Sequence, residues 1–96
     1  MTRFRDAYMD LITQWCEGQK KEVVNGLERG KGSNMVWNAV LRSGFSLAGE
    51  ILHSESCGHL SEDEAGDMIM ELYSDMDEVS KFFDDEWDKV VAMKRY

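Results

Sequence analysis

The chain of 96 residues contains no proline and no long run of apolar residues. Proline is the commonest helix breaker and a frequent turn residue, so its absence favours long helices over short strands joined by tight turns. No stretch approaches the roughly 18 apolar residues of a membrane span, and the first residues lack the apolar segment of a signal peptide. We therefore expect a soluble, cytoplasmic protein with no membrane partner.

Cysteine and histidine are also scarce, with two of each. Because no secretory signal is found, Cys16 and Cys57 are interpreted as free thiols. His53, Cys57 and His59 are close in sequence, but their spacing is not that of paired zinc ligands, so we predict no metal site. A cysteine nucleophile with a histidine base would also need an orienting group and an oxyanion site, which no motif supplies. We predict no catalytic residue and no cofactor, and an enzyme built on Cys57 and His59 is only a third alternative.

The residues that are present suit a small globular protein. Apolar residues make up 43% of the chain and charged residues 31%, with three tryptophans, four phenylalanines and three tyrosines. This composition is compatible with a packed core, and so short a chain has room for only one. We predict a single all-α domain over residues 1–96, a compact three- to four-helix bundle with a long acidic C-terminal helix.

Two segments show the helical period clearly. Residues 36–53 place their apolar and small side chains on one half of a helix, which predicts the central helix of the domain, with Ser33 as its N-cap. A second helix is predicted from residue 62 to about residue 93. Its start is well marked, because Ser61 and Glu64 have the spacing of a capping box.

The N-terminal segment is less regular. Phe4 and Trp15 belong to one apolar stripe, but Val23 and Leu27 fall out of phase with it on a helical wheel. We therefore expect a kink or break near Gly18. The sequence leaves open whether residues 2–29 form one helix or two.

The negative charge is confined to one part of the chain. Residues 1–60 carry seven basic and seven acidic side chains, whereas residues 61–88 carry twelve acidic side chains against the single Lys81. The formal charge of this second segment is −11, and the last eight residues add +3 to give the total of −8. Like charges three or four residues apart on a helix repel one another. Two interpretations stay open, an acidic face kept for solubility and a binding surface for a basic partner.

A binding surface would include apolar residues as well as acidic ones. On a helical wheel Met70 falls among the acidic residues, near Tyr73 and Asp77, and an apolar anchor within a charged rim is the usual anatomy of a protein interface. We therefore predict a partner-binding surface formed by Asp63, Asp67, Met70, Glu71, Tyr73, Asp77, Glu78, Asp85 and Asp88.

These features predict an interaction protein, an inhibitor or adaptor whose last helix docks on a basic protein. The expected partner is a nuclease or another nucleic-acid-binding protein. Direct binding of nucleic acid is not expected, because phosphates would be repelled by the acidic helix. By analogy of charge and size, such a protein could be a viral nucleic-acid mimic that acts against host defence, or an immunity or antitoxin protein.

A structural role is the alternative. Apolar residues recur at spacings of four and three from Ala65 to Phe83, as in the seam of a coiled coil, so the last helix could pair with a second copy to form a homodimer or larger homo-oligomer. Glu86 interrupts the next position of this seam. A single-chain bundle would need the same residues for its own core.

Overall fold

The computed structural model describes residues 3–94. This part of the chain forms three α-helices, α1 (Arg3–Glu28), α2 (Ser33–Ser56) and α3 (Glu62–Lys94), and contains no strand. The prediction of an all-α protein is confirmed. Among residues 3–94, no helix has both the length and the apolar character needed to cross a lipid bilayer.

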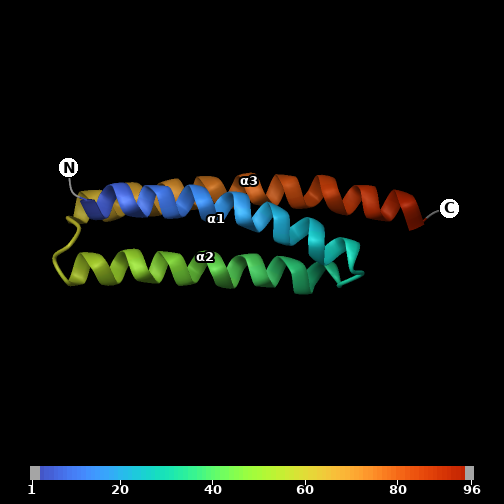
Figure 1. The fold of residues 1–96 in the computed structure, drawn as a ribbon, viewed down its shortest axis with the longest axis horizontal. Coiled ribbons are helices and arrows are strands. Elements are labelled where there is room, and N and C mark those ends of the chain that lie inside the picture. Colours follow the sequence, from blue (N-terminus) through green and yellow to red (C-terminus); the bar gives the residue numbers. More distant parts are fainter. Residues whose placement is uncertain (1–2, 95–96) are drawn as a thin grey trace.

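The three helices lie along one long axis. α1 and α3 run in the same direction and α2 returns antiparallel to both, as Figure 1 shows, and every pair of helices is in contact. The molecule measures 55 × 18 × 15 Å, with a radius of gyration of 15.6 Å. A compact domain of this length would have a radius of gyration of about 12.5 Å. The chain is therefore elongated rather than compact, because α3 has 33 residues and at 1.5 Å per residue spans about 50 Å.

Glycine residues end the first two helices. Gly30 and Gly58 have φ angles of 78° and 82°, a left-handed conformation that L side chains rarely adopt. After α1 the amide of Lys31 donates to the carbonyl of Gly26 at 3.0 Å, and after α2 the amide of His59 donates to Ser54 at 2.9 Å. These bonds are those of the Schellman motif, which satisfies the last free carbonyls of a helix.

The helix starts agree only partly with the sequence prediction. α3 begins with the predicted capping box: the Glu64 amide donates to Ser61 Oγ at 3.1 Å, and the Ser61 amide donates to Glu64 Oε1 at 3.0 Å. For α2 the predicted N-cap is wrong by one residue, because Ser33 is already helical and Gly32 occupies the cap position with extended backbone angles. Gly32 offers no side chain for capping, so α2 starts without the hydrogen bond that was expected.

The core consists of two apolar clusters arranged along the molecule. One lies near the start of α1 and is built around Ile12, Ile51 and Leu72, which are fully buried. The other lies near the α1–α2 turn and includes Val23 and Val79. Trp15 packs against both clusters. An elongated molecule with three helices has room for such a narrow core and leaves many apolar side chains near the surface.

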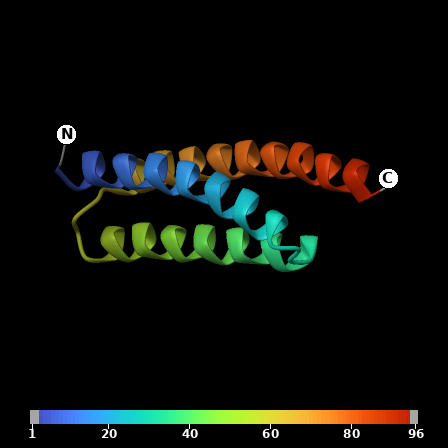
Figure 2. The same ribbon diagram turned by 45° about the vertical axis from the view of Figure 1, so that its right-hand side comes forward.

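α1 is one continuous helix, so of the predicted kink or break near Gly18 the break is wrong. The buried positions of α1 are Ile12, Cys16, Val23 and Leu27, which follow a single helical stripe once Cys16 is counted as an apolar residue. The apparent change of phase arose because the sequence interpretation used the half-exposed Phe4 and omitted Cys16. α1 bends gently, and its second half approaches α2 (Figure 2).

Candidate functional site

The predicted surface lies entirely on α3, and all nine of its residues are exposed. Seven acidic side chains of α3 are exposed and make no ion pair or hydrogen bond with any described residue. One is Glu62, the first residue of α3, and we call the other six the acidic row: Asp63, Asp67, Glu71, Asp84, Asp85 and Asp88. Asp84 was not among the residues of the predicted surface. From Asp63 to Asp88 the row extends over about 38 Å at 1.5 Å per residue.

Two of the predicted contact residues already have partners within the chain. Asp77 lies 3.4 Å from the ammonium group of Lys81, one helical turn away. Glu78 is held more firmly, because its Oε2 lies 2.7 Å from Lys20 Nζ on α1 and also accepts a hydrogen bond from Cys16 Sγ at 3.2 Å. The hydrogen bonds from Lys20 and Cys16 lower the pKa of Glu78 below its usual value. Glu78 therefore links α3 to α1 and is less available to an external partner than the acidic row.

Burial and charge keep the thiol of Cys16 protonated. Its side chain is buried between α1 and α3, and its sulfur also lies 3.8 Å from the carbonyl oxygen of Asp75. Burial, the hydrogen bond to Glu78 and the charge of Asp75 together raise the pKa of Cys16 to about 12. Burial and the neighbouring carboxylates Glu71 and Glu78 also raise the pKa of Asp75. Cys16 acts as a packed, unreactive side chain of the core.

Met70 and Tyr73 are the apolar members of the predicted surface. Their exposed fractions are 73% and 53%, so both are available to a partner. Three further large apolar residues are similarly exposed on α2, Met35 at 63%, Phe45 at 58% and Leu52 at 49%. The sequence interpretation placed Phe45 and Leu52 in the apolar half of a central helix. Three helices cover only part of that half, so Phe45 and Leu52 remain on the surface.

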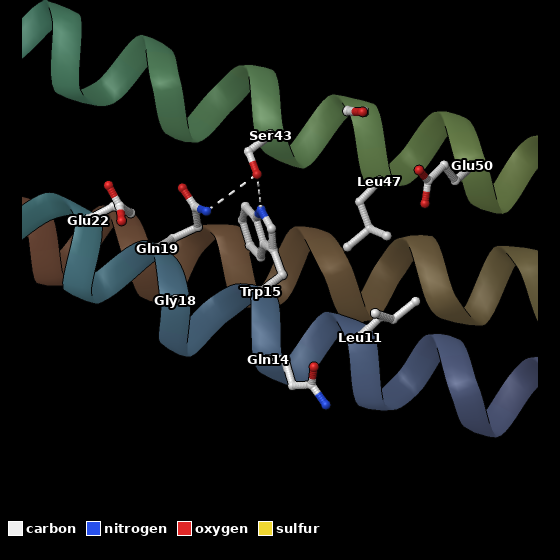
Figure 3. Close-up of a pocket in the computed structure, with 10 residues that line it drawn as sticks. Leu11, Gln14, Trp15, Gly18, Gln19, Glu22, Ser43, Leu47 and Glu50 are labelled. Atoms are coloured by element: carbon white, nitrogen blue, oxygen red, sulfur yellow. Dashed lines mark hydrogen bonds between the residues drawn. The ribbon is translucent and has the colours of Figure 1, made fainter.

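An open groove separates α1 from α2 and has a volume of about 580 Å³. Figure 3 shows Trp15 and Gln19 reaching across it to Ser43. Trp15 Nε1 donates to Ser43 Oγ at 2.6 Å, and Gln19 Nε2 donates to the same oxygen at 3.3 Å. These bonds join the two helices across the groove and give Ser43 Oγ two donors. Helix packing therefore accounts for the positions of Trp15, Gln19 and Ser43.

The cysteine and histidine residues do not form one site. Cys57 follows α2 and lies 3.5 Å from His53 Nε2, whereas the ring of His59 stacks on Phe4 with centroids 4.4 Å apart. Cys16 is buried elsewhere, against α3. Within residues 3–94, no three His, Cys, Asp or Glu side chains are grouped so that they could hold a metal ion. The imidazole beside Cys57 is His53, so the alternative that paired Cys57 with His59 has no support from the geometry.

No protein family model, no curated protein and no solved structure matches the chain. The interpretation of its surface therefore depends on the physical chemistry of the exposed residues alone.

Proposed function

We propose that this three-helix bundle is a small inhibitor or adaptor that docks the acidic face of α3 on a basic protein. A nuclease or another nucleic-acid-binding protein is the partner class that fits, as for a viral nucleic-acid mimic or for an immunity or antitoxin protein. The proposal rests on one observation: the six carboxylates of the acidic row are exposed and lack partners among the described residues, while Met70 and Tyr73 are exposed beside them.

Keeping these negative charges together on one helix costs free energy. Like charges at helical spacings of three and four repel one another by a few tenths of a kcal/mol per pair. Glu78 and Asp77 show how α3 relieves this repulsion where a cation is near, through Lys20 and Lys81. The acidic row has no such relief within the described chain. A basic partner would supply it and would associate rapidly, because complementary charges steer the encounter.

The alternative of a homo-oligomer joined through the α3 seam is less well supported. Ala65, Leu72 and Val79, at the centre of the predicted seam, are at most 2% exposed because α1 and α2 cover them. A second copy could reach them only if the helices separated. An oligomer of this protein would have to use other residues.

The test neutralises part of the acidic row and measures what the protein captures. The variant Asp67→Asn, Asp85→Asn, Asp88→Asn removes three exposed carboxylates without touching Glu78, which is bound to Lys20. The matched control, Asp6→Asn, Asp10→Asn, Glu28→Gln, makes the same change in net charge on exposed positions of α1. Each protein is immobilised and exposed to native lysate at about 0.05 M and about 0.5 M NaCl, and the retained proteins are quantified by mass spectrometry.

We expect the wild type and the α1 control to retain the same basic proteins at low salt, and the α3 variant to lose most of them. High salt should release them from all three proteins, because exposed charges are screened beyond about 8 Å at physiological ionic strength. Equal retention by the α3 variant, or retention of no basic protein by the wild type, would overturn the proposed function.

A further inference from the structure

Some of the exposed apolar residues of α2 and α3 lie on the same side of the molecule, Phe45 and Leu52 on α2 and Met70 and Tyr73 on α3. Phe45 and Leu52 are seven residues apart on α2, so they lie on one face, two turns from each other. Both are about half exposed or more, with values of 58% and 49%. Single exposed apolar residues are ordinary on a protein surface, but a group of them marks a site of interaction.

The alignment of α2 against α3 shows which residues of α3 lie level with Phe45 and Leu52. Gly44 packs against Met76, since a Cβ at Gly44 would lie 3.0 Å from Met76 Sδ, and the rings of Trp37 and Phe83 lie 5.7 Å apart. The helices are antiparallel, and both contacts give the same register, because a step of seven residues along α2 is matched by a step of seven along α3. In this register Phe45 lies level with residues 75–76 of α3 and Leu52 lies level with residues 68–69.

Tyr73 lies between these two levels and on the side of α3 that faces α2. It is three residues before Met76 and four after Ile69, and both of these partly buried residues pack on the core. Met70 follows Ile69 in the sequence and points more toward solvent, with an exposed fraction of 73%. We call these four residues the seam patch, and they are Phe45, Leu52, Met70 and Tyr73.

The charges around the seam patch differ on its two sides. On the α3 side it is bordered by acidic side chains, including Asp63, Asp67 and Asp77. On the α2 side the exposed surface carries little charge: of the 24 residues of α2 only Arg42, Glu50 and Glu55 are formally charged, with histidine counted as neutral. A partner that covers the patch would thus meet apolar surface at its centre and negative charge along one edge.

We propose that the seam patch and the acidic row form one docking surface for a cationic amphipathic helix of the partner protein. The apolar side chains of that helix lie on Phe45, Leu52 and Tyr73, and its lysine and arginine side chains lie along the acidic row. This arrangement follows the general mode in which an amphipathic helix lays its apolar face on an apolar surface of its partner. The inference rests on the proposed function and extends it, because it names the element of the partner that α3 recognises and adds α2 to the interface.

The test uses two synthetic peptides of 18 residues that contain only leucine and lysine in equal composition. In one peptide the leucines recur at positions i, i+3, i+4 and i+7, which gives an amphipathic helix, and in the other the same residues are scrambled. Affinities are measured by titration calorimetry, and the contact surface is mapped from the amide chemical shifts of the nitrogen-15-labelled 96-residue protein.

We expect the amphipathic peptide to bind at least about tenfold more tightly than the scrambled one, since only it presents an apolar face to the patch. Shift changes should include residues around Phe45, Leu52 and Tyr73. The double variant Phe45→Ser, Leu52→Ser should bind the amphipathic peptide about tenfold or more weakly than the wild type does. Its affinity for the scrambled peptide should be unchanged.

The matched control is Leu11→Ser, Met35→Ser, which removes two other exposed apolar side chains, 44% and 63% exposed. Leu11 lines the α1–α2 groove, and Met35 lines a small cavity with Gln19 and Glu22 of α1, so both lie on the opposite side of α2 from the seam patch. This control should bind both peptides like the wild type.

The outcomes separate the two proposals. If the two peptides bind with equal affinity, or if Phe45→Ser, Leu52→Ser does not change the affinity for the amphipathic peptide, the seam patch is not part of the docking surface. Docking driven by charge alone is not contradicted by these results. If the variant Asp67→Asn, Asp85→Asn, Asp88→Asn binds both peptides as tightly as the wild type does, the proposed function is overturned. If light scattering shows a wild-type dimer that Phe45→Ser, Leu52→Ser converts to a monomer, the patch belongs to a second copy of the chain and the present inference is overturned.

Discussion

The two cysteines differ in both exposure and surroundings. Cys57 is exposed after the end of α2, whereas Cys16 is 3% exposed and donates a hydrogen bond to Glu78. Since the thiolate is the reactive form, the raised pKa of Cys16, about 12, and its burial both make it inert. At pH 8 we expect a disulfide reagent such as dithionitrobenzoate to modify one thiol per folded chain. The variant Cys57→Ser should show no rapid reaction, and a rapid reaction in that variant would contradict the environment of Cys16.

The same thiol predicts a loss of stability at high pH. The pKa of Cys16 in the folded protein, about 12, lies above its ordinary value of 9.0. The stability contributed by the protonated thiol is therefore complete below pH 9 and is lost as the pH rises toward 12, because the unfolded chain releases its proton first. Urea denaturation from pH 8 to pH 11 should show a decline for the wild type that is smaller in Cys16→Ala. Equal declines would show that other groups are responsible.

Glycine positions on the three helices differ in the room they leave. A Cβ at Gly26 would lie 2.9 Å from Cγ2 of Val36, a buried and β-branched side chain that cannot move aside easily. Gly26→Ala should therefore lower the free energy of unfolding by about 1–3 kcal/mol.

At Gly66 a Cβ meets nothing within 4 Å. Gly66→Ala should raise the free energy of unfolding by about 0.5–1 kcal/mol, since alanine is the better helix former. Urea denaturation measures both, and a stabilising Gly26→Ala would contradict the close approach of α1 and α2.

At the scale of the element, the start of α3 depends on one reciprocal pair of hydrogen bonds. Ser61 Oγ accepts from the Glu64 amide, so Ser61→Ala leaves a helix N-terminus without its cap. We expect a loss of about 1 kcal/mol in the free energy of unfolding. Ser74→Ala is the control on the same helix, because Ser74 is exposed and bonds to no described residue. It should be neutral or slightly stabilising, and equal effects of the two substitutions would show that the capping box contributes nothing.

The elements also show what a sequence pattern can determine. The capping box, the helical period and the glycines that stop α1 and α2 depend on residues within about one or two turns, so the sequence located α3 closely and α2 to within a few residues. The error at Gly18 has a tertiary cause. Gly18 did not break α1, because tertiary packing of the stripe from Ile12 to Leu27 outweighs the roughly 1 kcal/mol that glycine costs in a helix.

At the scale of the whole molecule, the acidic row makes stability depend on salt. Repulsion between exposed carboxylates on α3 destabilises the folded chain, and salt screens it. We expect the melting temperature to rise by several degrees, about 4–8 °C for each kcal/mol, as NaCl increases from about 0.05 to about 0.5 M. The variant Asp67→Asn, Asp85→Asn, Asp88→Asn should have a higher melting temperature than the wild type at low salt. Its melting temperature should also change less with NaCl concentration. A melting temperature that falls with salt would mean that ion pairs such as Lys20–Glu78 dominate the electrostatics.

The sequence by itself determined the all-α class, the start of α3 and the confinement of negative charge to residues 61–88. Each of these follows from composition or from residues close together in the chain. Only the tertiary structure decided that Glu78 is bound by Lys20, that Phe45 and Leu52 stay exposed, and which part of α3 lies level with them. These relations join residues far apart in sequence, and they depend on which faces three helices can cover and on the register of α2 against α3. A helical period shows that a face is apolar, but the number of neighbouring helices decides how much of that face stays in contact with water.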